Sequence, residues 1–159
     1  MAAGLFTNDP IIAQNFFLEI DAKVISSLTA VTGLDIEVAV SSTRQAGAGG
    51  VAEAIKAMGT RTLAPEITLV RVAPIDSTKD EMWKWFNGLR DKGLKATERA
   101  GQRKNGSVVL YDTSKLEVAR FNFFSAWPSR IATDGLNVDS SEVVKETITL
   151  QCERLERIK

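Results

Sequence analysis

The stretch DSTKDEMWKWFNGLRDKG, residues 76–93, carries the strongest helix signal in the chain. Its bulky apolar residues recur at positions i, i+3, i+4 and i+7, which places them on one face of an α-helix: Met82, Trp85, Phe86 and Leu89. Thr78 followed by Glu81 predicts a capping box at the start of the helix, and Gly93 predicts a left-handed residue at its end. A lone helix with one heavy apolar stripe must cover something, and the flanking segments are the candidates.

Period-two alternation marks those flanking segments as strands. The clearest case puts Leu34, Ile36, Val38 and Val40 on one side and Asp35, Glu37, Ala39 and Ser41 on the other, which predicts a half-buried strand with its apolar side in the core. About seven such strands follow one another along the chain. The pattern predicts a mainly β, α+β fold, in which an antiparallel β-barrel or sandwich has one flanking α-helix.

The domain organisation is simple, with one unusual segment. We expect residues 1–12 to form an N-terminal arm and residues 13–159 a single domain. Residues 41–60, SSTRQAGAGGVAEAIKAMGT, are rich in Gly, Ala and Ser and poor in bulky apolar residues, with residues 52–58 as candidates for a short helix. A loop of this length without core residues is usually functional or disordered. It is either a loose hairpin end or an extended inter-subunit arm that orders against another chain, and we expect the second.

Composition removes several classes of function. The chain has 20 basic and 20 acidic residues, so bulk charge gives no support for nucleic-acid binding, while the balance permits self-association. A single cysteine, Cys152, excludes a disulfide framework within the chain. The absence of histidine removes the commonest general base and the commonest zinc ligand. We therefore expect no cofactor and no bound metal. The N-terminus shows neither a signal peptide nor a membrane segment.

The remaining motifs favour a structural protein over an enzyme. The glycines of residues 47–50 lack the spacing of a phosphate-binding loop. Trp83, Trp85 and Trp127 fit core packing better than a stacking platform for bases or sugars. The alternatives are a monomeric β-barrel that binds a small ligand and an enzyme that works with Asp, Glu and Lys alone. Residues 41–60 have no role in the ligand-binding alternative.

Several segments, in the same order along the chain, resemble the tail-tube protein family of contractile phage tails and phage-like contractile injection systems. They span about residues 13–157 and comprise NFFLEID (15–21), AVTGLDIEVAV (30–40), WKWF (83–86), RKNGSVVL (103–110), EVARFNFFSAWP (117–128) and the final strand at 146–155. Relatives of this family include the ring-forming haemolysin-coregulated proteins.

The resemblance implies a structural protomer that is not an enzyme. Such proteins form hexameric rings that stack into the rigid inner tube, which a contracting sheath drives through a target envelope. The implied partners are other copies of the chain, the sheath protein, baseplate or hub and terminal cap proteins, and a luminal cargo or tape-measure protein. The implied location is a virion tail or injection particle assembled in the bacterial cytoplasm.

The resemblance also assigns roles to particular residues. Contacts between subunits or rings are expected from the arm and the outer side of the helix, at Arg44, Gln45, Val51, Ile55, Met58 and Trp83. Polar strand faces are expected to line a water-filled lumen, at Asp35, Glu37, Thr147, Thr149 and Gln151.

Overall fold

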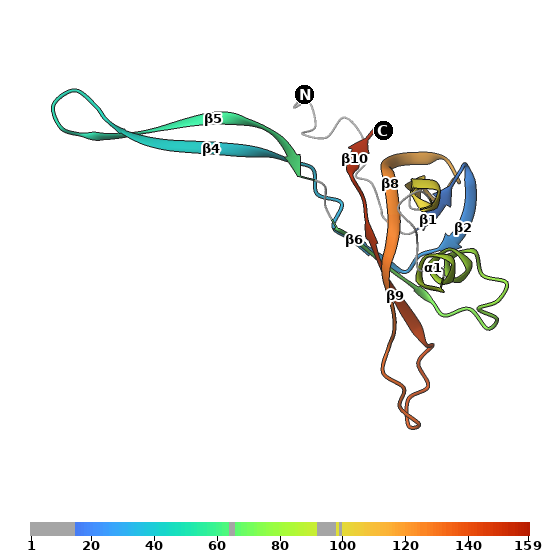
Figure 1. Ribbon diagram of the computed structural model, residues 1–159. Coiled ribbons are helices and arrows are strands. Elements are labelled where there is room, and N and C mark those ends of the chain that lie inside the picture. The colour runs from blue at the N-terminus through green and yellow to red at the C-terminus, as the bar shows by residue number, and fades with distance from the viewer. Residues whose placement is uncertain (1–14, 64–65, 92–97, 99) are drawn as a thin grey trace, which may run out of the picture.

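Strands dominate the computed structural model, which describes residues 15–63, 66–91, 98 and 100–159 (Figure 1). The strands are β1 (Asn15–Ile20), β2 (Lys23–Ser27), β3 (Ala30–Thr32), β4 (Glu37–Ala46), β5 (Ala52–Leu63), β6 (Glu66–Val72), β7 (Lys104–Tyr111), β8 (Glu117–Thr133), β9 (Lys145–Gln151) and β10 (Arg154–Arg157). One α-helix, α1 (Glu81–Asp91), and one short 3-10 helix, η1 (Ala100–Gln102), accompany them. The predicted mainly β fold with a single flanking helix is confirmed. The predicted N-terminal arm lies outside the described residues.

The long strand β8 organises the sheet into two layers. Its first half pairs with β7 and β10, and its second half pairs with β9. Layer A therefore contains β2, β1, β7, the first half of β8 and β10, and layer B contains the second half of β8, β9, β6 and β3. Between the halves Ser125 has a φ of 51°, and its N–H donates to Asn105 Oδ1 at 2.9 Å. The sheet is antiparallel throughout and does not close among the described strands, so the architecture is an open sandwich.

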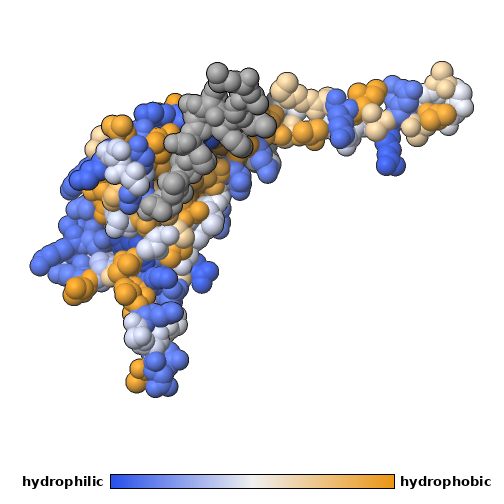
Figure 2. Space-filling model, turned by 180° about the vertical axis from the view of Figure 1, so that it is seen from behind, coloured by the Kyte–Doolittle hydropathy of each residue, from blue (hydrophilic) through white to orange (hydrophobic). Residues whose placement is uncertain are grey.

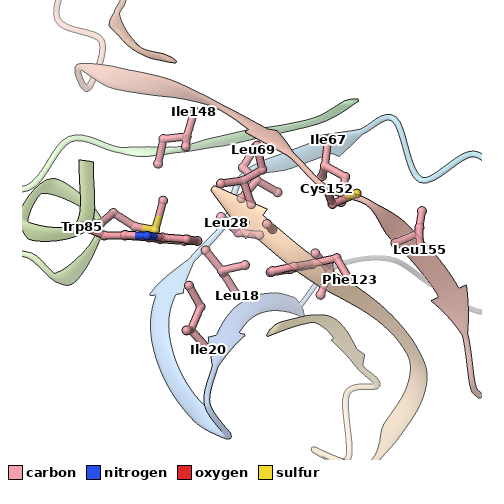
Figure 3. Close-up of a cluster of buried hydrophobic side chains, with 14 residues drawn as sticks. Leu18, Ile20, Leu28, Ile67, Leu69, Trp85, Phe123, Ile148, Cys152 and Leu155 are labelled. Atoms are coloured by element: carbon pink, nitrogen blue, oxygen red, sulfur yellow. The ribbon is translucent and has the colours of Figure 1, made fainter. Parts of the chain in front are cut away.

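The core lies where the inner faces of the two layers meet (Figure 3). Layer A contributes Leu18, Val108, Phe123 and Leu155, and layer B contributes Ile67, Leu69, Ile148 and Leu150. Met82 and Trp85 of α1 are buried with them, as the helix pattern predicts. Phe86 and Leu89 are only half-buried, because α1 covers the margin of the core rather than its centre. Cys152 is buried in the same cluster.

The start of α1 differs from the prediction. The helix begins at Glu81, and Asp80 caps it, since the Trp83 backbone N–H donates to Asp80 Oδ2 at 3.0 Å. Thr78 is instead held in a turn before the helix, where its N–H donates to Asp76 Oδ1 at 3.0 Å. The predicted Thr78–Glu81 capping box is therefore wrong, because Asp76 takes the Thr78 side chain. The predicted closing residue, Gly93, lies outside the described residues.

A buried arginine fastens this first turn of α1 to the sheet. Arg71, on the inner side of β6, donates from Nη1 and Nη2 to the two oxygens of Asp80 at 2.8 and 2.7 Å. Its Nε and Nη2 donate to Glu146 Oε2 on β9 at 3.2 and 3.1 Å. The Trp83 indole N–H donates to the other Glu146 oxygen at 3.1 Å. Arg71 of β6 thus joins the helix cap to β9, and the Trp83 indole shares the Glu146 carboxylate with it.

The segment expected to be a loop is a long hairpin. β4 and β5 pair over residues 37–63 and project away from both layers (Figure 1). The predicted short helix at 52–58 is therefore wrong, since those residues belong to β5. The predicted burial of the apolar side at 34–40 is also wrong in part, because Ile36, Val38 and Val40 are 50%, 52% and 68% exposed. No layer of the described chain covers them. Leu34, nearer the body, packs against the core.

Arg71→Met should lower the free energy of unfolding by about 3–5 kcal/mol, because it leaves two carboxylates buried without their cation. Urea denaturation of the purified chain measures the change. Arg90→Met is the matched control, since Arg90 pairs with Asp91 on the exposed end of the same helix and should change stability little. A triple variant that also carries Asp80→Asn and Glu146→Leu should recover much of the loss. A triple variant no more stable than Arg71→Met would contradict the buried-charge explanation.

Acid should weaken the same attachment. Burial opposes ionisation of Asp80, but hydrogen bonds from Arg71 and the Trp83 N–H outweigh it and hold the pKa of Asp80 below its ordinary value of 3.8. The ionised carboxylate therefore stabilises the fold above about pH 4, and this contribution is lost as the pH falls through the lowered pKa. Melting temperatures from about pH 6 to pH 2 should fall less steeply for Asp80→Asn than for the unmodified chain. Asp91→Asn should keep the full slope, and an unchanged slope in Asp80→Asn would refute the assignment.

Candidate assembly surfaces

The hairpin has two chemically different faces. Cross-strand pairing joins Val40 to Met58, Ser42 to Lys56, Arg44 to Ala54 and Ala46 to Ala52. Directly opposed residues share a face, so Arg44 and Lys56 lie on the same side, and we call it the basic face. The other side contains Ser41, Thr43, Gln45, Glu53, Ile55 and Ala57. Among the predicted contact residues, Arg44 and Met58 thus lie on the basic face, and Gln45 and Ile55 lie behind them.

Large apolar side chains on the hairpin are open to solvent. Val40, Met58, Ile55 and Val51 are 68%, 84%, 47% and 65% exposed. Figure 2 shows hydrophobic and hydrophilic residues side by side along the projection. An isolated two-stranded ribbon is marginally stable in water, and clustered exposed apolar residues mark interaction sites. The hairpin is therefore a candidate surface for contact with another molecule.

The base of the hairpin contains a tight contact between its strands. The register shifts between Val38 and Val40, and a Cβ added to Gly59 would lie 2.5 Å from the Ala39 carbonyl oxygen. Only glycine fits this position, and the irregularity marks where the ribbon leaves the body.

The outer face of layer B is polar and nearly neutral. Strand register aligns Thr32, Thr68, Thr149 and Arg130 in one row and Ala30, Val70, Thr147 and Ala132 in the next. A third row contains Glu66, Gln151 and Trp127, in which Gln151 Nε2 donates to Glu66 Oε2 at 2.6 Å. We call this surface the threonine face. It brings together Thr147, Thr149 and Gln151, whereas Asp35 and Glu37 are exposed at the base of the hairpin.

Trp83 has partners within its own chain. It is half-buried, and its indole N–H donates to Glu146. Its ring meets the Phe86 ring edge to face, with centroids 6.1 Å apart and an interplanar angle of 82°. The sequence places Trp83 off the apolar stripe but gives no sign of the Glu146 partner. Its expected role in contacts between subunits stays a prediction.

A second polar cluster lies on the outer face of layer A. Arg120 Nη1 donates to Glu19 Oε2 at 2.8 Å, and Nη2 donates to Glu117 Oε2 at 2.7 Å. The hydrogen bond from Arg120 lowers the pKa of Glu117, and burial raises the pKa of the neighbouring Tyr111 hydroxyl. Because its charges are paired with one another, the cluster pins β1 to β7 and β8 rather than offering an unpaired acid or base.

The connection between β8 and β9, residues 134–144, forms an exposed apolar end that sequence reasoning missed. Leu136, Val138 and Val143 are 78%, 102% and 62% exposed. The Ala73 N–H donates to the Val144 carbonyl at 2.9 Å and thereby brings Ile75 and Val72 to the same end. We call this surface the loop end. Its apolar residues are separated by turn formers in LNVDSSEVV, so no helix or strand period reveals them.

Residues suited to catalysis or metal binding do not gather in the described part of the chain. Among these residues, no group of three or more His, Cys, Asp or Glu side chains is arranged to hold a metal ion. The Cys152 thiol is buried, and burial raises its pKa. None of the described helices has the length and apolar character needed to span a membrane.

Comparison with known proteins gives a consistent result. The family described as T4-like virus tail tube protein gp19 matches residues 13–156. A chain of the PVC sheath–tube complex of an extracellular contractile injection system matches with a TM-score of 0.74 and 20% identity over 95% of this chain and 93% of that chain. A chain of the PVC sheath/tube terminator matches with a TM-score of 0.76 and 20% identity over 97% of this chain and 100% of that chain.

A more distant likeness extends to Hcp1 from Salmonella typhimurium, with a TM-score of 0.52 and 14% identity over 92% of this chain and 86% of that chain. These low identities show the fold alone. No curated protein sequence matches significantly. The family match spans nearly the whole sequence, and it confirms both the resemblance and the expectation of a structural protein rather than an enzyme. The chain belongs to the tail tube protein family of T4-like viruses and is a structural protomer of a tube.

Proposed function

We propose that this chain forms hexameric rings that stack into a hollow inner tube, with the β4–β5 hairpin as a contact between subunits and between rings. The observation that carries the proposal is the hairpin itself, an apolar ribbon that its own chain leaves uncovered. Arg44, Gln45, Val51, Ile55 and Met58 all lie on it and are exposed. A neighbouring copy supplies the second surface that a stable ribbon needs.

The threonine face lines the lumen in this proposal. It is continuous across four strands, and four threonine hydroxyls and the Gln151 amide lie along it. β3 and the second half of β8 form the two margins of layer B among the described strands, so each can meet a neighbour around a ring. Such closure also removes exposed sheet edges, which otherwise promote aggregation. Asp35 and Glu37 then mark the rim, where the hairpin leaves layer B.

The partners follow from the setting of the similar structures, whose chains come from a sheath–tube complex, a terminator, a cap and a baseplate. A contractile sheath surrounds the tube and drives it through a target envelope, and baseplate or hub and cap proteins close its ends. The exposed side of α1, with Trp83 at its edge, meets the sheath or an adjacent subunit. Assembly takes place in the bacterial cytoplasm, and a cargo or tape-measure protein occupies the lumen.

Deletion of residues 44–57 should leave the body folded but prevent stacking of rings, because none of the deleted side chains is buried in the core. Thermal denaturation monitors the fold, and negative-stain microscopy with sedimentation monitors rings and tubes. The full chain, purified in parallel, is the reference. Tubes of normal length from the deletion variant would overturn the proposed role of the hairpin. Loss of the fold would show that the body needs the hairpin in order to fold.

A thiol at the threonine face should be protected inside assembled tubes. In a Cys152→Ala background, Thr149→Cys should react readily with a bulky polymer-linked maleimide in disassembled protein and far more slowly in long tubes. Ser114→Cys, in the exposed turn between β7 and β8, is the control and should react at similar rates in both states. Equal protection at both positions, or none at position 149, would place layer B elsewhere than the lumen.

A further inference from the structure

Exposed large apolar side chains gather at two places on this molecule. Twelve of the fifteen in the described chain lie either on the hairpin with its base or at the loop end. The first group is Ile36, Val38, Val40, Val51, Ile55 and Met58, and the second is Val72, Ile75, Leu136, Val138, Val143 and Val144. Scattered single apolar residues need no explanation, but two concentrated groups indicate two binding surfaces.

The two surfaces lie at opposite ends of layer B. The hairpin strand β5 ends at Leu63, just before Glu66 opens β6, and Glu66 pairs with Gln151. The loop end adjoins the far end of β6, where Val72 pairs with Lys145. A seven-residue strand spans about 20 Å. The hairpin projects away from that strand and not along it toward the loop end (Figure 1). One copy therefore does not place its own hairpin on its own loop end, and the contact needs two copies.

The charges of the two surfaces are complementary. The basic face carries Arg44 and Lys56, while Glu53 lies on the opposite face. The β8–β9 connection carries Asp134, Asp139 and Glu142. Within the described part of the chain, none of these five basic-face and loop side chains forms an ion pair. Opposite charges at the margins of an apolar contact guide association and select orientation.

The shapes of the two surfaces are also compatible. A hollow of about 300 Å³ at the loop end has an apolar lining of Leu136, Val138, Val143 and Val144. The charged residues around it are two carboxylates, Asp134 and Glu142, and one cation, Lys145. The hairpin tip is slender, because Gly49 and Gly50 have φ values of 87° and 78° and open space around them. Val51 follows them and is 65% exposed. A narrow apolar tip followed by two cations suits a small apolar hollow at which carboxylates outnumber the single lysine.

We propose that the tip and basic face of one copy's hairpin dock on the loop end of a second copy. The contact joins different surfaces of the two molecules, so it continues head to tail and builds a filament rather than a closed dimer. This inference rests on the proposed function and names the surface that receives the hairpin from the next ring. Apolar burial at the tip supplies the affinity, and the charge pairs set the register.

Charge reversal tests the pairing directly. Arg44→Glu with Lys56→Glu, and separately Asp139→Lys with Glu142→Lys, should each reduce mean tube length at least about tenfold, and the four changes together should restore most of it. Microscopy measures tube length, and native mass spectrometry counts subunits per ring. Glu53→Lys, on the opposite face of the hairpin, is the matched control and should leave tube length unchanged. All reversed residues are exposed, so each variant keeps the fold.

Cross-linking supplies an independent measurement. In a Cys152→Ala background, Val51→Cys combined with Val138→Cys should give a ladder of disulfide-linked multimers on oxidation of tubes, whereas either change alone gives none beyond a dimer. Normal tube length in both charge-reversal variants would overturn this contact without affecting the proposed function. So would a four-change variant whose tubes are as short as those of either charge-reversal pair alone. Failure of the unmodified chain to form any ring or tube would overturn the proposed function and this contact with it.

Discussion

The guanidinium of Arg71 is the interaction on which the arrangement of this molecule depends. It is buried between a strand and a helix, and it forms ion pairs with two carboxylates from different parts of the chain, Asp80 and Glu146. Burying the cation without those carboxylates would be unfavourable. Without the cation, the Asp80 carboxylate would in turn lose the ion pair that stabilises it at the start of the helix. The helix is therefore placed by charge as well as by its apolar stripe. The Arg71–Asp80 ion pair fixes the first turn of α1 against β6, and in this position Met82 and Trp85 reach the core.

Different physical rules govern the body and the hairpin. In the body, each strand is covered on its inner face, and buried polar groups find partners among the described residues. In the hairpin, hydrogen bonds between β4 and β5 satisfy the backbone, but no apolar layer covers the side chains. Such a ribbon gains little from forming alone, because its apolar surface stays in water. In the proposed tube, a neighbouring copy would cover that surface and stabilise the ribbon, which is consistent with the family to which the chain belongs.

Local patterns in the sequence predict which residues share one face of a helix or strand, because the backbone geometry of each element sets that period. Met82 and Trp85 follow the helical period and are buried, and the alternation of Thr147 and Thr149 with Ile148 and Leu150 matches the two faces of β9. The alternation at residues 34–40 has the same form, yet much of its apolar side is exposed, because alternation shows that a strand has two faces but not whether anything covers them.

Other features depend on contacts that are remote in sequence. The partner of Arg71 at Glu146 is 75 residues away, and no motif announces it. The sequence predicts a loop for the Gly- and Ala-rich segment because it has little bulky apolar content and its glycines favour a flexible tip. Cross-strand hydrogen bonding overrides that weak preference over a long ribbon. The loop end shows neither period nor charge run, so only three-dimensional proximity reveals it.

Strand β8 has a mechanical consequence. One strand of 17 residues, bent at Ser125, belongs to both layers, so hydrogen-bonded strand rather than a loop joins the layers. Sliding one layer past the other would require breaking ladders on both sides of Ser125 at once. The backbone of β8, shared by both layers, therefore makes each subunit resist shear between them. A column made of such subunits resists buckling under an axial push without relying on its interfaces alone.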